Sequence, residues 1–352
     1  MTMPERFSAA ALTQFSESVL RAAGLPPAPA AAVASTLVDG DLLGHDTHGL
    51  ALLKPYVQEI EKGGMAIAGE PTLISDRGAS VLWDGGHLPG PWLVLQGIEM
   101  LIPRARQFGN ATLSIRHSHH IACLAAYLLR ATEAGFMMLL SCSNPAAQSV
   151  APFGGTKAVF TPNPIAAGIP TSGTPFLIDI SASITTNGMT NRMHKAGQQF
   201  DEACLLDGQG NPSRDPAVLA EDPPGTILPL GGLTGGHKGF GLGLLIEALT
   251  SGLGGHGRAD APQGWGASVF ISLYDPSAFG GQAAFMRQMD WIAQACRSNP
   301  PRPDVAQVRM PGDRGIARRA EQLRDGITLH PSIPPMLAEL ARKFGQDEPR
   351  SC

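Results

Sequence analysis

Between residues 79 and 140 the sequence alternates short apolar stretches with longer helical patterns, and this alternation limits the folds open to the chain. Strands that alternate with helices are typical of an α/β layered structure. We therefore expect an α/β fold. The predicted strands cover residues 79–83, 112–116 and 136–140, and the predicted helices cover residues 92–108 and 121–134.

A helical segment precedes this region. Residues 7–24 are predicted to form a helix capped by Ser8, and residues 28–43 a second, alanine-rich helix. A third helix is expected over residues 46–60, shortened or kinked at Pro55. The second half of the chain is less regular. Further helices are predicted there over residues 239–253, 280–297 and 334–344.

Composition excludes several classes of protein. The 26 basic and 30 acidic residues nearly balance, which argues against a general nucleic-acid surface. No apolar run is long enough for a membrane helix, and the N-terminus has no signal-peptide core. The five cysteines contain no CxxC pair, so reduced thiols in a cytoplasmic protein are expected.

The segment Gly44–Gly49 (GHDTHG) places two histidines at the expected start of the third helix. On a regular helix His48, Leu52 and Tyr56 share one face, because they are four residues apart. His48 beside Asp46 is suited to proton transfer near neutral pH. The alternative is that a polar side chain of this segment caps the helix and that its histidines are ordinary surface residues.

A second histidine-rich segment, His117–His120 (HSHH), directly follows a predicted strand. Strand alternation directs His117 and His119 to one face and the other two residues to the opposite face. A metal-dependent hydrolase that uses His117, His119 and His120 is one alternative, but no further ligand recurs at the required spacing. The segment is better interpreted as a ligand crevice at the end of a strand, and no metal site is expected.

The stretch Gly231–Gly243 (GGLTGGHKGFGLG) is rich in glycine and precedes a predicted helix. Glycines allow backbone N–H groups to approach an anion at a helix start, and Lys238 adds a positive charge. The stretch is neither a P-loop nor the GxGxxG dinucleotide fingerprint. The equal alternative is that the glycines only permit close packing. Asp179, inside the apolar strand 176–180, needs partners if it is buried.

Taken in order, these segments resemble the malate/L-lactate dehydrogenase family, which lacks a Rossmann fingerprint. That family includes ureidoglycolate, sulfolactate and diketogulonate dehydrogenases and the piperideine- and pyrroline-2-carboxylate ketimine reductases. The resemblance covers roughly residues 8–345, and the joint order of the motifs is more specific than any one of them. The matched motifs are GxDSHG at 44–49, S-x-H at 118–120, P-F-G-G at 152–155, T-N-P at 161–164, D-x-A-T-S at 179–183, A-L-D-x-x-G-x-P-T-x-D-P at 205–216, G-x-K-G-x-G-L at 236–242 and P-G-E/D-R-G at 311–315.

The resemblance implies a mixed-sheet, non-Rossmann NAD(P)-binding domain of the sulfolactate-dehydrogenase type, with an N-terminal helical segment and an interleaved second domain. It also implies a homodimer with the active site near the subunit interface. The expected division is an N-terminal helical segment over 1–65 with a pocket helix at 44–60, an α/β substrate-side region over 66–135, a cofactor-binding α/β domain over 136–300, and a C-terminal segment over 301–352 that returns to the first domain.

The resemblance also assigns roles to residues. His48 and His120 match the histidines that transfer protons in different members of the family. The expected cofactor is NADH or NADPH, and the sequence leaves the choice between them open. Substrate-pocket positions correspond to Thr47, Leu52, Tyr56 and Ser118, and cofactor-contacting positions to Asp179, Ile180, Ser181, Ser183, Lys238, Pro311, Gly312 and Asp313.

The chain departs from the family at Thr47, where serine is usual, at Gly188-Met189, where the family has a G-K pair, and most informatively at position 52. Members that act on 2-oxo acids usually carry an arginine four residues after the histidine of the GxDSHG segment, where it binds the substrate carboxylate. Leu52 stands there in this chain. Either another cation takes this role, with Arg116, Arg192 and Lys54 as candidates, or the substrate is less acidic and more apolar.

The sequence therefore predicts an oxidoreductase that transfers hydride between NAD(P)H and a C=O or C=N acceptor of the 2-oxo acid or cyclic ketimine class. His48 or His120 is expected to move the proton. A small-molecule substrate is expected, without nucleic-acid or membrane partners. The alternative is a ligand-binding or regulatory protein on a degenerate dehydrogenase scaffold, a reading that Leu52 favours.

Overall fold

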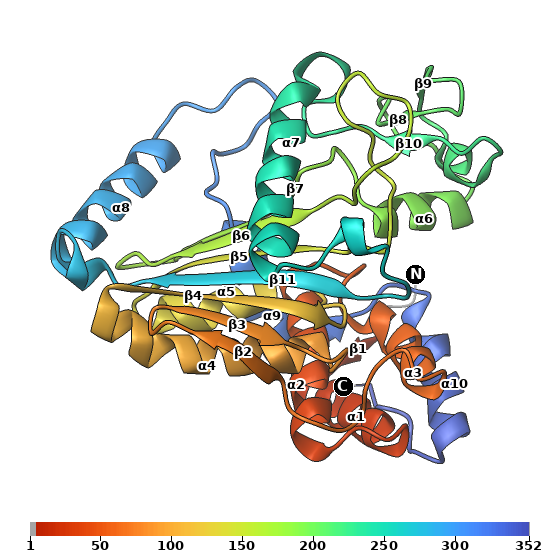
Figure 1. Cartoon of the computed structure of the whole chain (residues 1–352), viewed down its shortest axis with the longest axis horizontal. Coiled ribbons are helices and arrows are strands. Elements are labelled where there is room, and N and C mark those ends of the chain that lie inside the picture. Colours follow the sequence, from red (N-terminus) through yellow and green to blue (C-terminus); the bar gives the residue numbers. More distant parts are fainter. Residues whose placement is uncertain (1–4, 352) are drawn as a thin grey trace.

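A seven-stranded mixed sheet lies at the centre of the computed structural model, which describes residues 5–351 (Figure 1). Strands β3 and β4 pair in parallel, and the other neighbouring strands pair antiparallel. The prediction of an α/β fold with a mixed sheet is confirmed. In spatial order the strands are β2 (Thr72–Asp76), β3 (Ser80–Asp84), β4 (Asn110–Ser118), β11 (Ala267–Tyr274), β5 (Met137–Ser143), β6 (Pro164–Ile169) and β7 (Phe176–Ser181).

Strand β11 occupies the middle of this sheet, although it comes far later in the chain than its neighbours. It pairs with β4 on one side and with β5 on the other. Seven of its eight residues are buried, and its sequence (ASVFISLY) suits a strand covered on both faces. The sequence analysis did not predict it. Because of β11, one continuous sheet runs through both residues 66–135 and residues 136–300.

The predicted strands and helices between residues 79 and 140 are confirmed as β3, β4 and β5 with helices α4 (Gly90–Phe108) and α5 (Ala125–Glu133). Helix α4 packs on β4 and β11, and α5 packs on β6 and β7. Figure 1 shows α4 on one side of the sheet and α7 (Gly232–Glu247) on the other. The sheet is therefore covered on both faces, as its apolar strands require.

The first two predicted helices are also confirmed, as α1 (Ala9–Ala22) and α2 (Pro27–Leu43). Ser8 caps α1, because its hydroxyl oxygen accepts a hydrogen bond from the N–H of Ala11 at 3.0 Å. Strand β1 (Arg6–Phe7) pairs with β12 (Ile327–Thr328) near the other end of the chain. Helix α9 (Asp313–Asp325) packs on α2, and α10 (Ile333–Phe344) packs on α1. The two ends of the chain thus share one apolar core.

The remaining elements lie at the periphery. A small antiparallel sheet has the order β10 (Thr226–Ile227), β8 (Leu205–Leu206), β9 (Pro212–Ser213). Helix α6 (Asn187–Lys195) follows β7, and α8 (Gln282–Arg297) follows β11.

Two predicted helices begin elsewhere than expected. Residues 45–49 form turns rather than a helix, a short 3-10 helix covers Leu50–Leu52, and α3 runs from Leu53 to Glu61. The prediction that His48, Leu52 and Tyr56 lie on one regular helix is therefore wrong. The side chain of Leu52 is half-buried and packs against the core of the N-terminal helices.

The glycine-rich stretch is not a loop before the helix, because α7 already begins at Gly232. Its glycines allow close packing. A Cβ on Gly239 would collide with the backbone of Leu230, and one on Gly236 would lie 2.9 Å from the ring of Phe153. Lys238 accordingly lies well inside α7 and is exposed, rather than standing at a helix start.

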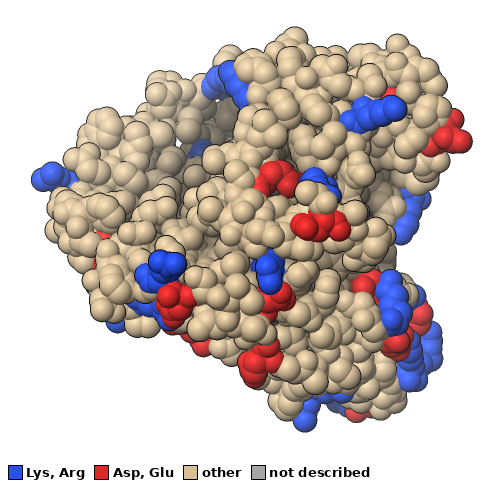
Figure 2. Space-filling model, in the orientation of Figure 1, with Lys and Arg blue, Asp and Glu red and all other residues tan. Residues whose placement is uncertain are grey.

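Among the described cysteines, Cys123, Cys142, Cys204 and Cys296 are free, and Cys352 lies outside the described residues. Helices long and apolar enough to span a membrane are absent from residues 5–351. Figure 2 shows acidic and basic side chains interspersed over the face in view.

We expect Gly90→Ala to destabilise the protein. Gly90 begins α4, and a Cβ there would collide with the carbonyl oxygens of His119 and His120. Such overpacking typically costs about 1–3 kcal/mol. Urea denaturation measures the loss. Gly235→Ala in α7 is the matched control, because a Cβ there meets nothing within 4 Å and should be neutral or stabilising. Equal effects of the two variants would contradict the packing argument.

Candidate active site

A buried carboxylate fixes the loop between α2 and the 3-10 helix. Asp41, near the end of α2, is 3% exposed and accepts a hydrogen bond from the N–H of Leu50 at 2.7 Å. Burial raises the pKa of Asp41 to about 7. Gly49 packs directly on this carboxylate, where a Cβ would not fit. The sequence analysis missed Asp41, whose signal is an acidic residue inside an apolar helix pattern.

The fixed loop presents His48 beside Thr47 and helix α6. The Nδ1 atom of His48 lies 2.8 Å from the Thr47 hydroxyl oxygen. Arg192 of α6 forms an ion pair with Asp46 at 2.8 Å and so ties this helix to the loop. Gly188 of α6 lies close to Thr47 and His48. Burial lowers the pKa of His48, partly opposed by the charge of Asp179.

The strand alternation expected for residues 117–120 fails. His117 adopts a left-handed backbone conformation (φ 50°) at the end of β4, so the side chains after it leave the strand pattern. Its Nδ1 atom lies 3.0 Å from the carboxylate of Asp84. Ser118 is fully buried, and its hydroxyl donates to the carbonyl oxygen of His119 at 2.8 Å. Within residues 5–351, His117, His119 and His120 do not form a group with metal-ligand spacing.

His120 lies next to His48, and its hydrogen bonds define its tautomer. The two rings stack with centroids 6.0 Å apart. The backbone N–H of Ala122 donates to Nδ1 of His120 at 3.2 Å, and the Tyr56 hydroxyl lies 2.8 Å from the same atom. Because a backbone N–H can only donate, Nδ1 carries no proton, and the neutral ring is protonated at Nε2. Burial holds the pKa of His120 well below its usual value.

Aromatic side chains pack against His120. Tyr56 is fully buried and sits against His120 rather than projecting from a shared helix face with His48. The ring of Trp265 lies 4.8 Å from that of His120 and 5.5 Å from that of Tyr56. Sequence reasoning did not select Trp265, which carries no motif. These aromatic rings contribute to the burial that lowers the pKa of His120.

A cavity of about 470 Å³ adjoins the loop and brings two predicted cofactor segments together. Asp179 and Ile180 at the end of β7 line it opposite Pro311 and Gly312. The segments are joined by a hydrogen bond of 3.0 Å from the N–H of Leu177 to the carbonyl oxygen of Pro311. The sequence prediction placed these residues in one site, and the structure does bring these four together.

The chemistry of this cavity fits an anionic ligand such as the diphosphate of a dinucleotide. Gly312 (φ 95°) caps the N-terminus of α9, and Arg314 and Arg318 from the first turns of α9 line the same cavity. Close packing requires a glycine here, because a Cβ on Gly312 would lie 2.8 Å from the backbone nitrogen of Leu177. The two arginines were missed, although Arg314 belongs to the P-G-D-R-G motif and Arg318 lies one helical turn after it, which is a usable signal.

The other predicted cofactor residues have different surroundings. Asp313 forms an ion pair with Arg297 at 2.7 Å, which lowers the pKa of Asp313. Ser181 and Ser183 donate their hydroxyl groups to nearby backbone carbonyls at 2.7 and 2.6 Å. Lys238 lies exposed on α7 rather than among the lining residues of the cavity. Their contacts with a cofactor stay predictions.

The chain is similar in sequence and in fold to known proteins. A profile of the family described as malate/L-lactate dehydrogenase matches residues 7–337. The chain is 30% identical to the L-lactate dehydrogenase of Cupriavidus necator over 347 residues, covering 96% of this chain and 98% of that protein. It is also 30% identical over 315 residues to the (2R)-3-sulfolactate dehydrogenase (NADP(+)) of Chromohalobacter salexigens, covering 87% and 89%. The solved delta1-piperideine-2-carboxylate reductase of Pseudomonas syringae pvar. tomato matches with a TM-score of 0.83 at 26% identity, covering 96% of this chain and 100% of that chain.

We expect His119 to make the protein less stable in acid. His119 is fully buried, and burial lowers its pKa from 6.5 to about 4. Between these values the unfolded chain takes up a proton that the folded chain does not, so stability falls as the pH falls. From pH 7.5 to pH 5 this linkage costs about 2 kcal/mol. We measure the free energy of unfolding by urea denaturation at both pH values. Between pH 7.5 and pH 5 it should fall by about 2 kcal/mol less in His119→Phe than in the native chain. The control His194→Ala, at an exposed position, should lose as much free energy of unfolding as the native chain. The same loss in His119→Phe would contradict the assignment of the acid destabilisation to His119.

Proposed function

Because this chain belongs to the malate/L-lactate dehydrogenase family, we propose that it transfers hydride between NAD(P)H and the carbon of a C=O or C=N acceptor. The observation that carries the proposal is the stacked pair His48 and His120 beside a cavity lined by Asp179 and the start of α9. Relatives named for lactate and sulfolactate support a 2-oxo acid as acceptor, and the reductase neighbour supports a cyclic imine.

Different side chains of the site would bind the cofactor and contact the acceptor. NAD(P)H, when bound, supplies the hydride. The N-terminus of α9, with Arg314 and Arg318, would hold its phosphate groups in the cavity, and the name of the sulfolactate relative supports NADP(H) as one form. His120 is held with its Nε2–H free, because Nδ1 is occupied by Ala122 and Tyr56. That proton can be shared with the oxygen or nitrogen of the acceptor.

The lowered pKa of both histidines keeps the rings neutral at neutral pH. The neutral His48 ring can accept the proton of a substrate hydroxyl during oxidation, whereas neutral His120, with Nδ1 occupied and Nε2 protonated, can only donate a hydrogen bond to the reacting oxygen. Reduction instead requires that His48 be protonated first, so the rate of reduction should rise as the pH falls.

Arg192 is the best of the three candidate replacements for the family's carboxylate-binding arginine. It lies beside the loop that carries His48, where its charge contributes to the lowered pKa of that histidine. All three candidates are ion-paired, but only Arg192 pairs with a residue of this loop. Arg116 pairs with Asp84, and Lys54 pairs with Glu339 at the surface. We therefore propose that Arg192 binds the substrate carboxylate in place of the residue that Leu52 has replaced.

We also propose that the protein is a homodimer in the cytoplasm. Four leucines on α7 and directly after it are about half exposed, which is unusual for large apolar side chains and favours a covered face. A second copy of the chain, as the sequence resemblance implies, is the occupant that we propose. The leucines are Leu233 (48%), Leu244 (50%), Leu245 (51%) and Leu253 (59%).

The proposal is tested by mixing the purified protein with NADH or NADPH and a panel of 2-oxo acids and cyclic imines, and following the loss of cofactor absorbance. We expect turnover with at least one acceptor. Cofactor binding without turnover of any acceptor would support a ligand-binding protein on this scaffold instead. If the protein neither binds cofactor nor turns over any acceptor, the proposal is refuted.

We expect His48→Ala and His120→Ala each to lower kcat at least tenfold while the cofactor Kd changes little. His48 can exchange a proton with the acceptor, and the Nε2–H of His120 can donate a hydrogen bond to it. General acid–base catalysis typically contributes about 10²–10⁴-fold. Stopped-flow turnover and fluorescence titration with cofactor measure the two quantities. His330→Ala, at a partly exposed position outside this site, is the control. Near-native kcat in both variants would refute their role.

We expect Arg192→Gln to raise KM for the preferred carboxylate substrate at least tenfold, because losing a charged partner costs about 2–5 kcal/mol. Steady-state kinetics measures the change, and Arg116→Gln serves as a control away from the loop. Asp46→Asn separates binding from loop positioning, because it breaks the same ion pair and keeps the arginine. An equal loss in Asp46→Asn would assign Arg192 to holding the loop, contrary to the proposal.

A further inference from the structure

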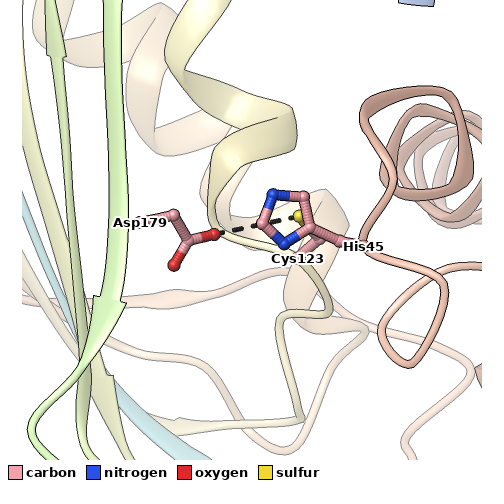
Figure 3. A group of neighbouring side chains, drawn as sticks. All are labelled: His45, Cys123 and Asp179. Atoms are coloured by element: carbon pink, nitrogen blue, oxygen red, sulfur yellow. Dashed lines mark hydrogen bonds between the residues drawn. The ribbon is translucent and has the colours of Figure 1, made fainter. Parts of the chain in front are cut away.

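Three side chains with different donor atoms meet at the edge of the cavity. His45 follows α2, Cys123 precedes α5, and Asp179 lies on β7 (Figure 3). Their ligand atoms all lie within 4.8 Å of one another. Among residues 5–351 this is the one group of histidine, cysteine and acidic side chains with such spacing. The histidines that the sequence singled out for a possible metal do not take part.

The geometry is close to that of a small metal centre. The Cys123 sulfur lies 3.9 Å from Oδ2 of Asp179. In a tetrahedral zinc site, a sulfur at about 2.3 Å and an oxygen at about 2.1 Å from the metal are about 3.6 Å apart. No separation in the group exceeds 4.8 Å, so none would have to close by much more than about 1 Å. Movement of the His45 side chain, which lines the open cavity, can supply that change.

The donor set selects a particular kind of cation. A thiolate, an imidazole and a carboxylate suit zinc and similar divalent ions, whereas magnesium and calcium prefer oxygen ligands alone. Thiolate and carboxylate together carry two negative charges, which match a divalent ion. Arg314 and Arg318 line the same cavity, and their charges oppose the binding of a cation and should lower its affinity.

We propose that His45, Cys123 and Asp179 bind one divalent cation of the zinc class, with a fourth coordination position open to the cavity. The thiol of Cys123 loses its proton to solvent as the metal–sulfur bond forms. Burial and the charge of Asp179 hold the pKa of this thiol well above its usual value, so the metal-free site keeps a neutral thiol. Asp179 is already oriented, because its Oδ2 accepts a hydrogen bond from the N–H of Ala125 at 2.9 Å.

The position of the site has a consequence that rests on the proposed function. Asp179 and His45 line the cavity that we propose for the cofactor. A bound cation would occupy the edge of that space, so cation and NAD(P)H should compete. The cation would then act as an inhibitor of the enzyme.

Cobalt(II) provides a spectroscopic test of the site that does not require activity. The chelator-treated full-length protein is titrated with Co²⁺, and we expect a thiolate-to-cobalt band in the near ultraviolet that saturates at one equivalent, with the visible bands of four-coordinate cobalt. Cys123→Ser should abolish the near-ultraviolet band. Cys204→Ser and Cys296→Ser are matched controls at free cysteines outside the group and should keep it.

Two further variants complete the test. Cys123→Ala should behave like Cys123→Ser, and thermal melts of both establish that they fold. His45→Asn should weaken Co²⁺ binding at least tenfold. Absence of the band in the native protein, or its persistence in a folded Cys123 variant, would refute the metal site.

Saturating NADH or NADPH should raise the apparent Kd for Co²⁺. Unchanged Co²⁺ affinity with bound cofactor would refute competition while leaving the thiolate band as independent support for the site. A band in a protein that binds neither cofactor would support the metal site and count against the proposed function, so the two failures are distinguishable.

Discussion

The pairing of β11 between β4 and β5 is the interaction on which the rest of the structure depends. It places a late segment of the chain at the centre of a sheet built from earlier ones. The chain leaves β4 at Ser118 and enters α5, which packs on β6 and β7. This crossing brings His120 against the N-terminal helices and Cys123 next to Asp179. Both the His48–His120 pair and the proposed cation site follow from it.

One loop serves both sites. The carboxylate of Asp41 holds the N–H of Leu50 and leaves room only for glycine at position 49. The loop therefore has a fixed course, and successive side chains point to different places. His48 lies next to His120, whereas His45 lies next to Asp179 at the edge of the cavity. A ligand that moved this loop would alter both sites together.

Local signals explain which parts of the fold were predictable. Ser8, the alanine-rich pattern of α2 and the apolar stretches of β3, β4 and β5 act through neighbours within a few residues, and those elements were predicted correctly. Strand β11 has a similar composition but was missed, because nothing in its neighbourhood indicates a central position. The loop at residues 45–49 was predicted as helix, because the contacts that keep it irregular come from Asp41 and α6.

The sequence by itself determined the family, the mixed α/β class and the motifs from which candidate residues were chosen, because these depend on residue types and their order. Only the tertiary structure decided how those residues meet. It buried Tyr56 behind His120, brought Arg192 to the loop of His48 and assembled His45, Cys123 and Asp179 from three elements. Such contacts join residues far apart in the chain, and their distances and burial depend on packing that no local pattern records.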